Sequence, residues 1–423
     1  MTHKKGLLAL SPMFVLALLL LGGGILLGDF YKVQLIVVFL ITLIYAVATT
    51  RGESVTKRVE ILSRGAGEKN LLLMVWIFLL AGAFAHTAKA MGAIDATVNL
   101  TLSLLPSQLL LPGLFLAACF VSLSIGTSVG TIVALVPVAA GMSAPTGITL
   151  PLLVASVVGG SFFGDNLSFI SDTTIAATRT QGVKLSDKFK VNLKIAVPAA
   201  VVTFIVLTCL GFFGNPGNTV VVGDYNLWKV LPYILVIVLA VCGLDVMLVL
   251  VLGNVMAAAV GLVFGDLSLF SWMQNTAEGM TGMTETIFVA LMAGGLMELI
   301  RHNGGIGYLI YHLTRHVNGK RGAQFSIAAL VGVTNCCTAN NTVAILSVGK
   351  ITADIADRFG VDRRKTASLL DTFSCVVQGL IPYGAQLLLA GSLASVNSAS
   401  IVPYLYYNVI LGVCASLAIV FSK

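Results

Sequence analysis

Charged side chains are scarce in this sequence. Asp, Glu, Lys and Arg make up 10% of its 423 residues, against about 25% in soluble domains. None of the four occurs between Ala96 and Gly164. Hydrophobic residues make up 57%, and the mean hydropathy is +0.97. This balance excludes a soluble globular protein and predicts one membrane domain of about ten to twelve spans at ~20 residues each.

The sequence also lacks the motifs of common enzymes and pumps. GxSxG, HExxH, GxxxxGK[ST] and a Rossmann glycine fingerprint do not occur in a usable context. The seven cysteines show no CxxC spacing, so we interpret them as small buried hydrophobic residues. We therefore expect no enzyme activity and no cofactor. Transport would have to draw on ion gradients, with Na⁺ as a carried ion.

The basic residues are unevenly placed. The net charge is +7, but 22 of the 25 Lys and Arg fall in six segments: 1–5, 51–70, 175–194, 301–321, 350–365 and the C-terminal tail. These segments share one side if the uncharged stretches 108–142 and 323–349 are hairpins that re-enter the membrane. The positive-inside rule then makes both termini cytoplasmic. The basic excess thus reflects orientation and not a nucleic-acid surface. The expected spans are 7–28, 33–50, 71–91, 150–174, 192–213, 230–247, 249–264, 286–300, 366–389 and 403–421.

Two polar interruptions recur in the same order. The first hairpin centres on SIGTSVGT (124–131), and GGSFFGDNLSFISDTT (159–174) follows. The second centres on VTNCCTANNT (333–342), and LDTFS (370–374) follows. Pairing Thr127 with Thr334 and Asp165 with Asp371 gives almost the same offset twice. We predict an all-α polytopic membrane protein of two inverted repeats, 1–214 and 215–423. Each would hold a re-entrant hairpin and a broken transmembrane helix, at 150–174 and 366–389.

Three acids lie at or near these interruptions: Asp165, Asp172 and Asp371. An ionised Asp at bilayer depth costs at least ~2.5–3.5 kcal/mol, and the apolar halves of these spans supply no obvious Lys or Arg partner. Desolvation favours the protonated carboxyl group, so H⁺ and Na⁺ could compete for one carboxylate. For Asp172 a second interpretation is the N-cap of a helix that begins at Thr173.

Oxygen-bearing side chains surround the same interruptions, and hard cations prefer oxygen ligands. The alternative is that small polar residues only pack helices together. The predicted ion and proton ligands besides the acids are Thr127, Ser128, Asn166, Ser168, Asn335 and Thr338, with Asp165, Asp371, Ser128 and Asn335 as the metal-binding set. The predicted contacts of an organic substrate are Gln378, Tyr383, Asn340 and Asn341.

The motifs GTSVGT (126–131), GDNLSFISDTT (164–174) and LIPY (380–383) resemble those of the NhaC family of sodium/proton antiporters. That family often has Trp, His and Pro where this chain has Val129, Asn166 and Phe169. The resemblance implies Na⁺/H⁺ exchange, a scaffold domain that is often dimeric, and a transport domain that carries the hairpins. Relatives are assigned to exchange of organic acids or uptake of amino acids.

Three functions follow as hypotheses. The first is a secondary antiporter that exchanges Na⁺ for H⁺ across a bacterial cytoplasmic (inner) membrane, as a homodimer in the lipid bilayer. The second keeps this fold but couples Na⁺ to a small organic acid or amino acid. The third is a polytopic membrane enzyme or assembly protein, which would give no ion flux in vesicles. None of the three requires nucleic acid.

Overall fold

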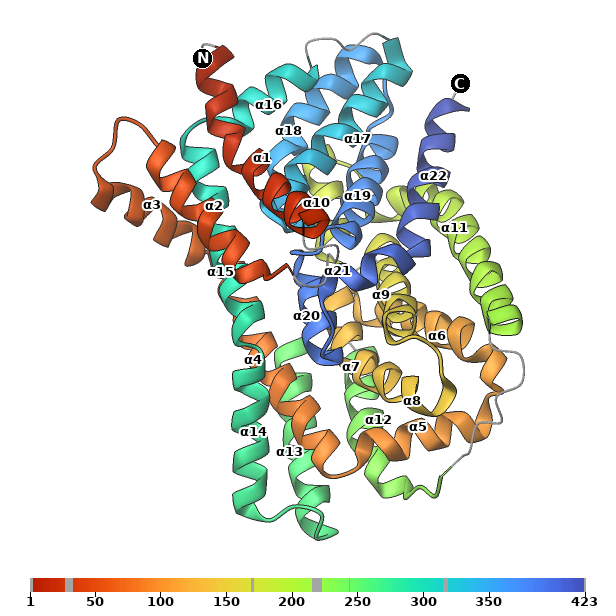
Figure 1. The fold of residues 1–423 in the computed structure, drawn as a ribbon. Coiled ribbons are helices and arrows are strands. Elements are labelled where there is room, and N and C mark those ends of the chain that lie inside the picture. Colours follow the sequence, from red (N-terminus) through yellow and green to blue (C-terminus); the bar gives the residue numbers. More distant parts are fainter. Residues whose placement is uncertain are drawn as a thin grey trace.

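The computed structural model describes residues 3–26, 33–168, 171–214, 223–242, 244–314 and 319–421, and within these ranges the chain is helical without a β-strand (Figure 1). The predicted all-α class is confirmed. The elements up to residue 214 are α1 (His3–Leu26), α2 (Leu35–Thr49), α3 (Val55–Ala66), α4 (Lys69–Ala90), α5 (Ala93–Leu104), η2 (Ser107–Leu109), α6 (Leu110–Ile125), α7 (Ser128–Gly141), α8 (Ser143–Thr146), α9 (Leu150–Leu167), α10 (Asp172–Gln181) and α11 (Leu185–Gly214).

The remaining elements repeat this order at a nearly constant offset. They are α12 (Leu227–Val241), α13 (Val246–Val263), α14 (Leu269–Gly282), α15 (Thr284–His302), α16 (Gly305–Thr314), α17 (Gly319–Thr338), α18 (Asn341–Phe359), α19 (Arg363–Leu380), α20 (Ala385–Ala394), α21 (Ser398–Ile401), η3 (Val402–Tyr404) and α22 (Tyr406–Val420). The difference in residue number between α9 (150–167) and α19 (363–380) is the same at the first and at the last residue. The same difference separates α10 (172–181) from α20 (385–394). We call this difference the repeat offset.

Backbone conformation at the hairpin breaks follows the repeat offset. Gly126 ends α6 with φ +77°, and Thr127 then caps α7 in an extended conformation. Ala339 has φ +50°, and Asn340 caps α18 in an extended conformation. A left-handed residue reverses the chain at a helix end, which glycine does without steric cost.

One side-chain contact also recurs at the repeat offset. Ser122 Oγ donates to the carbonyl oxygen of Ser161 at 2.5 Å, and Asn335 Nδ2 donates to that of Ser374 at 2.8 Å. Asn335 is the counterpart of Ser122, and Ser374 is the counterpart of Ser161. The α6–α7 hairpin is therefore bonded to α9 in the same way as the α17–α18 hairpin is bonded to α19.

The offset expected from the sequence, which pairs Thr127 with Thr334 and Asp165 with Asp371, is wrong. Thr334 lies inside α17 and Asp371 inside α19, so neither marks a break. The position equivalent to Asp165 is Gln378. Polar residues do not identify the second break, because small polar residues also occur within packed helices. The left-handed residue at that break is an alanine, Ala339, which has no polar group to mark it.

Close helix packing surrounds the first break. α9 is buried along most of its length against α6. A Cβ atom on Gly164 would overlap Ser122 Oγ and the Ser122 carbonyl carbon. The two backbones approach this closely only because position 164 carries no side chain, and this fixes α9 relative to the hairpin.

Within the described ranges, six helical stretches are long and apolar enough to cross a membrane, or seven if the bent pair Ser398–Tyr404 and Tyr406–Val420 forms one span. Shorter apolar helices accompany them. The expected span 230–247 is interrupted, because α12 ends at Val241 and the Asp245 side chain caps α13. The expected span 286–300 belongs to a longer stretch, Leu269–His302.

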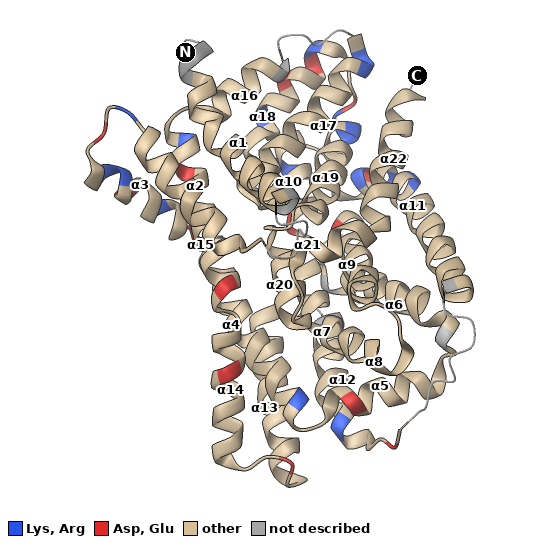
Figure 2. Cartoon of the chain, in the orientation of Figure 1, with Lys and Arg blue, Asp and Glu red and all other residues tan. Residues whose placement is uncertain are grey.

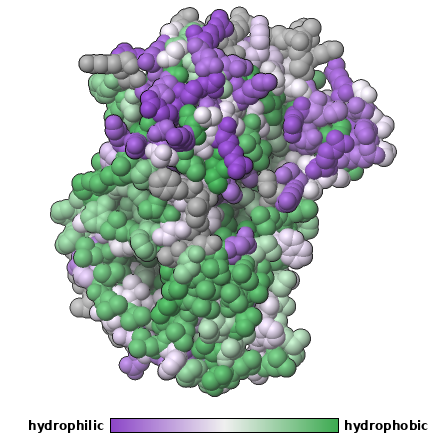
Figure 3. Space-filling model, turned by 180° about the vertical axis from the view of Figure 1, so that it is seen from behind, coloured by the Kyte–Doolittle hydropathy of each residue, from purple (hydrophilic) through white to green (hydrophobic). Residues whose placement is uncertain are grey.

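Charge and hydropathy divide the molecule into two zones. Most Lys and Arg gather at the end where both chain termini lie, near α3, α16, α17 and α18 (Figure 2). The reverse face is hydrophilic at that end and largely apolar below it (Figure 3). Exposed Phe, Val, Ile and Leu side chains along α11 and α13 belong to the apolar zone. This distribution fits a protein embedded in lipid with one polar end in water.

Candidate functional site

A cavity of about 360 Å³ lies where the interrupted elements of both halves meet. Its walls come from the α6–α7 break, the α9–α10 break with one face of α10, the start of α18, one residue of α20 and an apolar stretch of α4. The polar residues that line it are Thr127, Ser128, Asp165, Ser171, Asp172, Thr173, Arg179, Asn340, Asn341, Thr342 and Gln386. Six of the predicted site residues therefore surround one space: Thr127, Ser128, Asp165, Asp172, Asn340 and Asn341.

Asp165 is the buried acid of this cavity, with 4% of its surface exposed. Its carboxylate accepts a hydrogen bond from the Ser128 backbone N–H at 2.9 Å and another from Ser128 Oγ at 2.5 Å. Ser128 is the first residue of α7, so the carboxylate also faces the positive end of that helix dipole. These interactions stabilise the ionised carboxylate inside a buried site.

A chain of amides links Asp165 to the second half. Gln386 Nε2 donates to Ser128 Oγ at 3.1 Å, and Gln378 Nε2 donates to Gln386 Oε1 at 2.8 Å and to the Ala339 carbonyl oxygen at 3.0 Å. A continuous path of hydrogen bonds therefore connects Asp165 in the first half with the α17–α18 break at Ala339 in the second. Gln386 was not predicted, because a single glutamine within the apolar run 385–394 carries no spacing signal.

Asp172 differs from Asp165 in exposure. Its side chain is exposed at the cavity wall, as the first residue of α10. Ser171, not Asp172, occupies the N-cap position of that helix. The N-cap interpretation of Asp172 is therefore wrong, and its carboxylate remains free to face the cavity.

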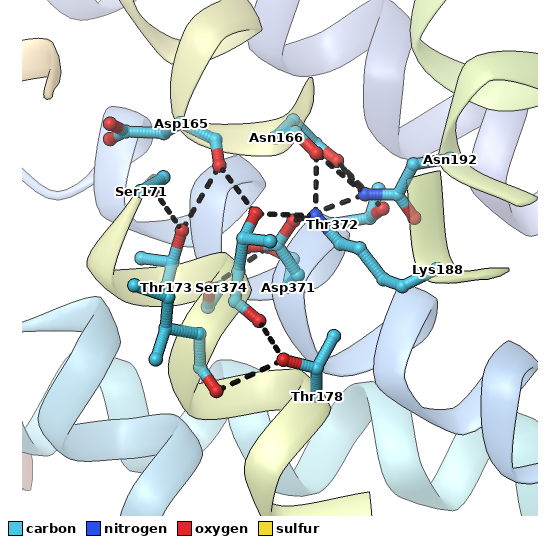
Figure 4. Close-up of polar contacts among 12 residues, drawn as sticks. Asp165, Asn166, Ser171, Thr173, Thr178, Lys188, Asn192, Asp371, Thr372 and Ser374 are labelled. Carbon is cyan, nitrogen blue, oxygen red and sulfur yellow. Dashed lines mark hydrogen bonds and ion pairs between the residues drawn. The ribbon is translucent and has the colours of Figure 1, made fainter. Parts of the chain in front are cut away.

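Asp371 belongs to a second polar centre, which is built around Lys188 (Figure 4). Lys188 Nζ lies 2.5 Å from Asp371 Oδ2, and the two side chains are 1% and 0% exposed. Asn192 Nδ2 donates to Asp371 Oδ2 at 3.0 Å. The expectation that no basic residue partners the buried acids is wrong for Asp371. The Asp165 carboxylate points away from this centre in Figure 4.

Lys188 was assigned to a cytoplasmic loop because it lies among basic residues in 175–194. In the structure α11 begins at Leu185, so the helix carries Lys188 into the protein. Lys188 and Asn192 are one helical turn apart and share one helix face. That spacing, directly before an apolar span, is the signal that could have identified them.

The other predicted residues hold backbone together near the two centres. The Asn166 carbonyl oxygen accepts from Lys188 Nζ at 2.6 Å, while Ser168 caps the C-terminus of α9. Tyr383 Oη donates to the Cys336 carbonyl oxygen at 2.8 Å, and Thr338 Oγ1 donates to that of Asn340 at 3.0 Å. These contacts shape the breaks.

The predicted metal-binding set does not converge on one point. Ser128 contacts Asp165 directly, but Asp371 pairs with Lys188, and Asn335 Nδ2 bonds the Ser374 backbone. Several buried polar atoms have no hydrogen-bond partner in the described ranges, among them Asp371 Oδ1, Asn335 Oδ1, Gln378 Oε1 and Asn341 Nδ2. Among the described residues no three His, Cys, Asp or Glu side chains cluster as metal ligands. Any cation in the cavity would use hydroxyl, amide and carbonyl oxygens around the one buried carboxylate there, that of Asp165.

Comparison with known proteins finds several antiporters of similar sequence. The chain is 23% identical over 391 residues to the malate-2H⁺/Na⁺-lactate antiporter of Bacillus subtilis, covering 84% of this chain and 82% of that protein. It is 24% identical to the Na⁺/H⁺ antiporter NhaC of the same organism, covering 81% of each. An arginine/ornithine antiporter of Halobacterium salinarum is 23% identical over 75% of this chain and 72% of that protein.

Among solved structures, the YdaH transporter of Alcanivorax borkumensis aligns with a TM-score of 0.46 at 12% identity, covering 91% of this chain and 97% of that one. The family model described as "Na+/H+ antiporter family" matches residues 6–212 and 219–422. The starts of the two matched stretches are related by the same repeat offset as the helix breaks. By this match over nearly its whole length, the chain belongs to the Na⁺/H⁺ antiporter family.

Proposed function

We propose that this antiporter exchanges Na⁺ for H⁺ at the carboxylate of Asp165. The single observation that carries the proposal is the position of Asp165: a buried acid, bonded twice by Ser128, at the wall of a cavity shared by both halves. Burial favours the protonated carboxyl group, whereas the Ser128 donors favour the ionised one. A group balanced in this way can hold either a proton or a sodium ion.

Competition for one carboxylate couples the two ions. When Na⁺ binds, the proton must leave, and when a proton binds, Na⁺ is released. Further oxygens for Na⁺ in the same cavity wall are those of Thr127, Ser128, Asn340 and Asn341. Asp172, exposed at the same wall, would attract the ion toward the buried carboxylate by charge.

A small organic acid or amino acid is the second candidate substrate. The cavity of about 360 Å³ exceeds the space of one ion with a few waters at roughly 30 Å³ each. Arg179 and the amides of Asn341 and Gln386 supply donors for a carboxylate. The related malate-2H⁺/Na⁺-lactate antiporter supports this alternative at a distance.

For the arrangement in the membrane, we propose that the halves 1–214 and 215–423 are inverted repeats, that both termini face the cytoplasm, and that the protein works as a homodimer in a bacterial inner membrane. The basic residues gathered at the end that holds both termini support the orientation. Labelling of single cysteines at residues 2 and 422, placed in a variant whose seven native cysteines are replaced, tests it in intact cells, and labelling from outside would overturn it.

The test of function uses the purified chain in liposomes loaded with a pH indicator. Adding Na⁺ should move protons in the wild type, and Asp165→Asn should abolish this movement while the protein still inserts and folds. Asp266→Asn is the matched control, because Asp266 pairs with Lys229 away from the cavity. Full exchange by Asp165→Asn would remove Asp165 from the mechanism. Proton movement that requires an added organic solute would favour the second candidate.

A further inference from the structure

The ammonium of Lys188 sits in a set of oxygens. Besides Asp371 Oδ2 at 2.5 Å, Lys188 Nζ contacts the Asn166 carbonyl oxygen at 2.6 Å and Thr174 Oγ1 at 2.7 Å (Figure 4). A carboxylate, a backbone carbonyl and a hydroxyl are the ligand types that hard cations take in proteins. Two more buried oxygens nearby, Asp371 Oδ1 and Asn192 Oδ1, have no hydrogen-bond partner within the part of the chain that the structure describes.

The Asn166 carbonyl oxygen is also placed to attract a cation. It lies in the last turn of α9, where carbonyl groups lack partners within the helix. It accepts from Asn192 Nδ2 at 2.9 Å as well as from Lys188. The negative end of the α9 dipole therefore faces this point, and a positive charge here is stabilised by both the dipole and Asp371.

The repeat shows that this centre is not required by the fold. At the repeat offset, the counterparts of Lys188, Asn192 and Asp371 are Ile401, Leu405 and Val158. All three are buried, at 0%, 1% and 0% exposure. The same scaffold thus accepts apolar side chains at the equivalent place. The charged pair is an addition to one half, and removing a buried pair as a whole is often tolerated whereas breaking it is not.

We propose that Lys188 is a tethered cation that occupies a second cation site, formed by Asp371, the Asn166 carbonyl oxygen and Thr174 Oγ1. Because the lysine fills this site permanently, only the Asp165 site takes an ion from solution. This second site deepens the proposed exchange, on which it rests, by setting the number of sodium ions that one chain holds.

The test is Lys188→Met in the full-length purified protein. Methionine ends one atom short of the Nζ position, so it keeps the apolar stem and frees the oxygens. Equilibrium binding of radioactive Na⁺ should show one more ion per chain than in the wild type. The thermal midpoint of the variant should also rise more with NaCl than with choline chloride. An unchanged number of bound ions would overturn the proposal.

Two variants control this result. Lys188→Met with Asp371→Val follows the apolar pattern of the other half and should lose the extra ion. Lys229→Met leaves Asp266 without its partner at 2.6 Å, but that pair is 23% and 26% exposed, so water can solvate the freed acid. It should bind no additional Na⁺. An extra ion in either control would count against the site.

Failure to fold is also informative. Recovery of Lys188→Met only when NaCl is present throughout purification would support the proposal, because Na⁺ then replaces the ammonium. If no folded Lys188→Met is recovered in either NaCl or choline chloride, the proposal is overturned. The wild-type ion count separates this inference from the proposed function: no Na⁺ bound by the wild type would contradict exchange at Asp165, whereas a gained ion in Lys188→Met would still support the second site.

Discussion

Asp165 and Gln378 occupy equivalent positions in the two halves, each one helical turn before the break of its helix, α9 and α19 respectively. Asp165 accepts two hydrogen bonds from Ser128, while Gln378 Nε2 donates to the Ala339 carbonyl oxygen. The two halves therefore present the same geometry with different chemistry. The charge lies in the first half, and a neutral amide stands opposite it.

The first prediction concerns the Ser128 hydroxyl. Ser128→Ala removes the 2.5 Å hydrogen bond to Asp165 Oδ2 but keeps the backbone N–H at 2.9 Å. A hydrogen bond to a charged group contributes about 1.5–3 kcal/mol. The Na⁺ concentration for half-maximal exchange should therefore rise about ten- to hundredfold, because protons compete better for the less stabilised carboxylate. Initial rates of proton movement against Na⁺ concentration measure this.

The matched control for that variant is Ser156→Ala. Ser156 lies on α9 and is buried, but its hydroxyl donates to the Leu152 carbonyl oxygen within its own helix. Its removal should leave the Na⁺ dependence unchanged. If Ser128→Ala behaves like Ser156→Ala, the hydroxyl is not part of the ion site.

The second prediction separates Asp172 from Asp165. Asp172 is exposed at the cavity wall, so Asp172→Asn should retain exchange and raise the half-maximal Na⁺ concentration only about two- to fivefold, as expected for a charge in water. Added choline chloride should shrink the difference from the wild type, since salt screens exposed charges. Complete loss of exchange would instead make Asp172 a carrier of the ion.

Much of the membrane architecture could be predicted from the sequence. Scarce charge indicates apolar spans, and the polar stretches at Thr127 and Asp165 do lie together at one cavity. Glycine marks the first break visibly. In each case the residue type predicts the structure because the alternative costs much free energy: a charge is costly to bury, and a left-handed backbone is costly for any residue with a side chain.

The remaining features depend on contacts between distant helices. Lys188 on α11 reaches Asp371 on α19, far along the chain. Its one-turn spacing from Asn192 is the single local feature that sets it apart from its exposed neighbours in the basic segment, and this spacing does not reveal the partner on α19. Ala339 has φ +50° although alanine does not favour that region. The surrounding packing imposes this conformation, so the true offset between the halves is visible in the structure and not in residue types.

The third prediction follows from Ala339. Ala339→Gly should stabilise the protein by about 0.5–1 kcal/mol. The left-handed conformation costs an L-residue roughly 1–2 kcal/mol, and part of this gain is offset because glycine raises the conformational entropy of the unfolded chain. The reciprocal change Gly126→Ala, at φ +77°, should destabilise by about 1 kcal/mol. Thermal midpoints in detergent should move in opposite directions; a shift of the same sign in both would refute the argument.

The fourth prediction concerns the contact of α6 with α9. Gly164→Ala would place Cβ against the Ser122 carbonyl carbon and 2.5 Å from the Leu123 nitrogen, both backbone atoms. Helix backbones cannot yield as a flexible side chain does, so the variant should lose about 1–3 kcal/mol or more of stability. Because Asp165 is the next residue, exchange should fall even in the fraction that folds.

Gly307→Ala is the matched control for this packing argument. Gly307 also lies within a helix, α16, and a Cβ atom there meets nothing within 4 Å. Alanine should raise the thermal midpoint slightly at that position, since it favours the helix by up to about 1 kcal/mol over glycine. A normal midpoint with full exchange in Gly164→Ala would mean that α6 and α9 can separate, and the close approach would then not be what positions Asp165.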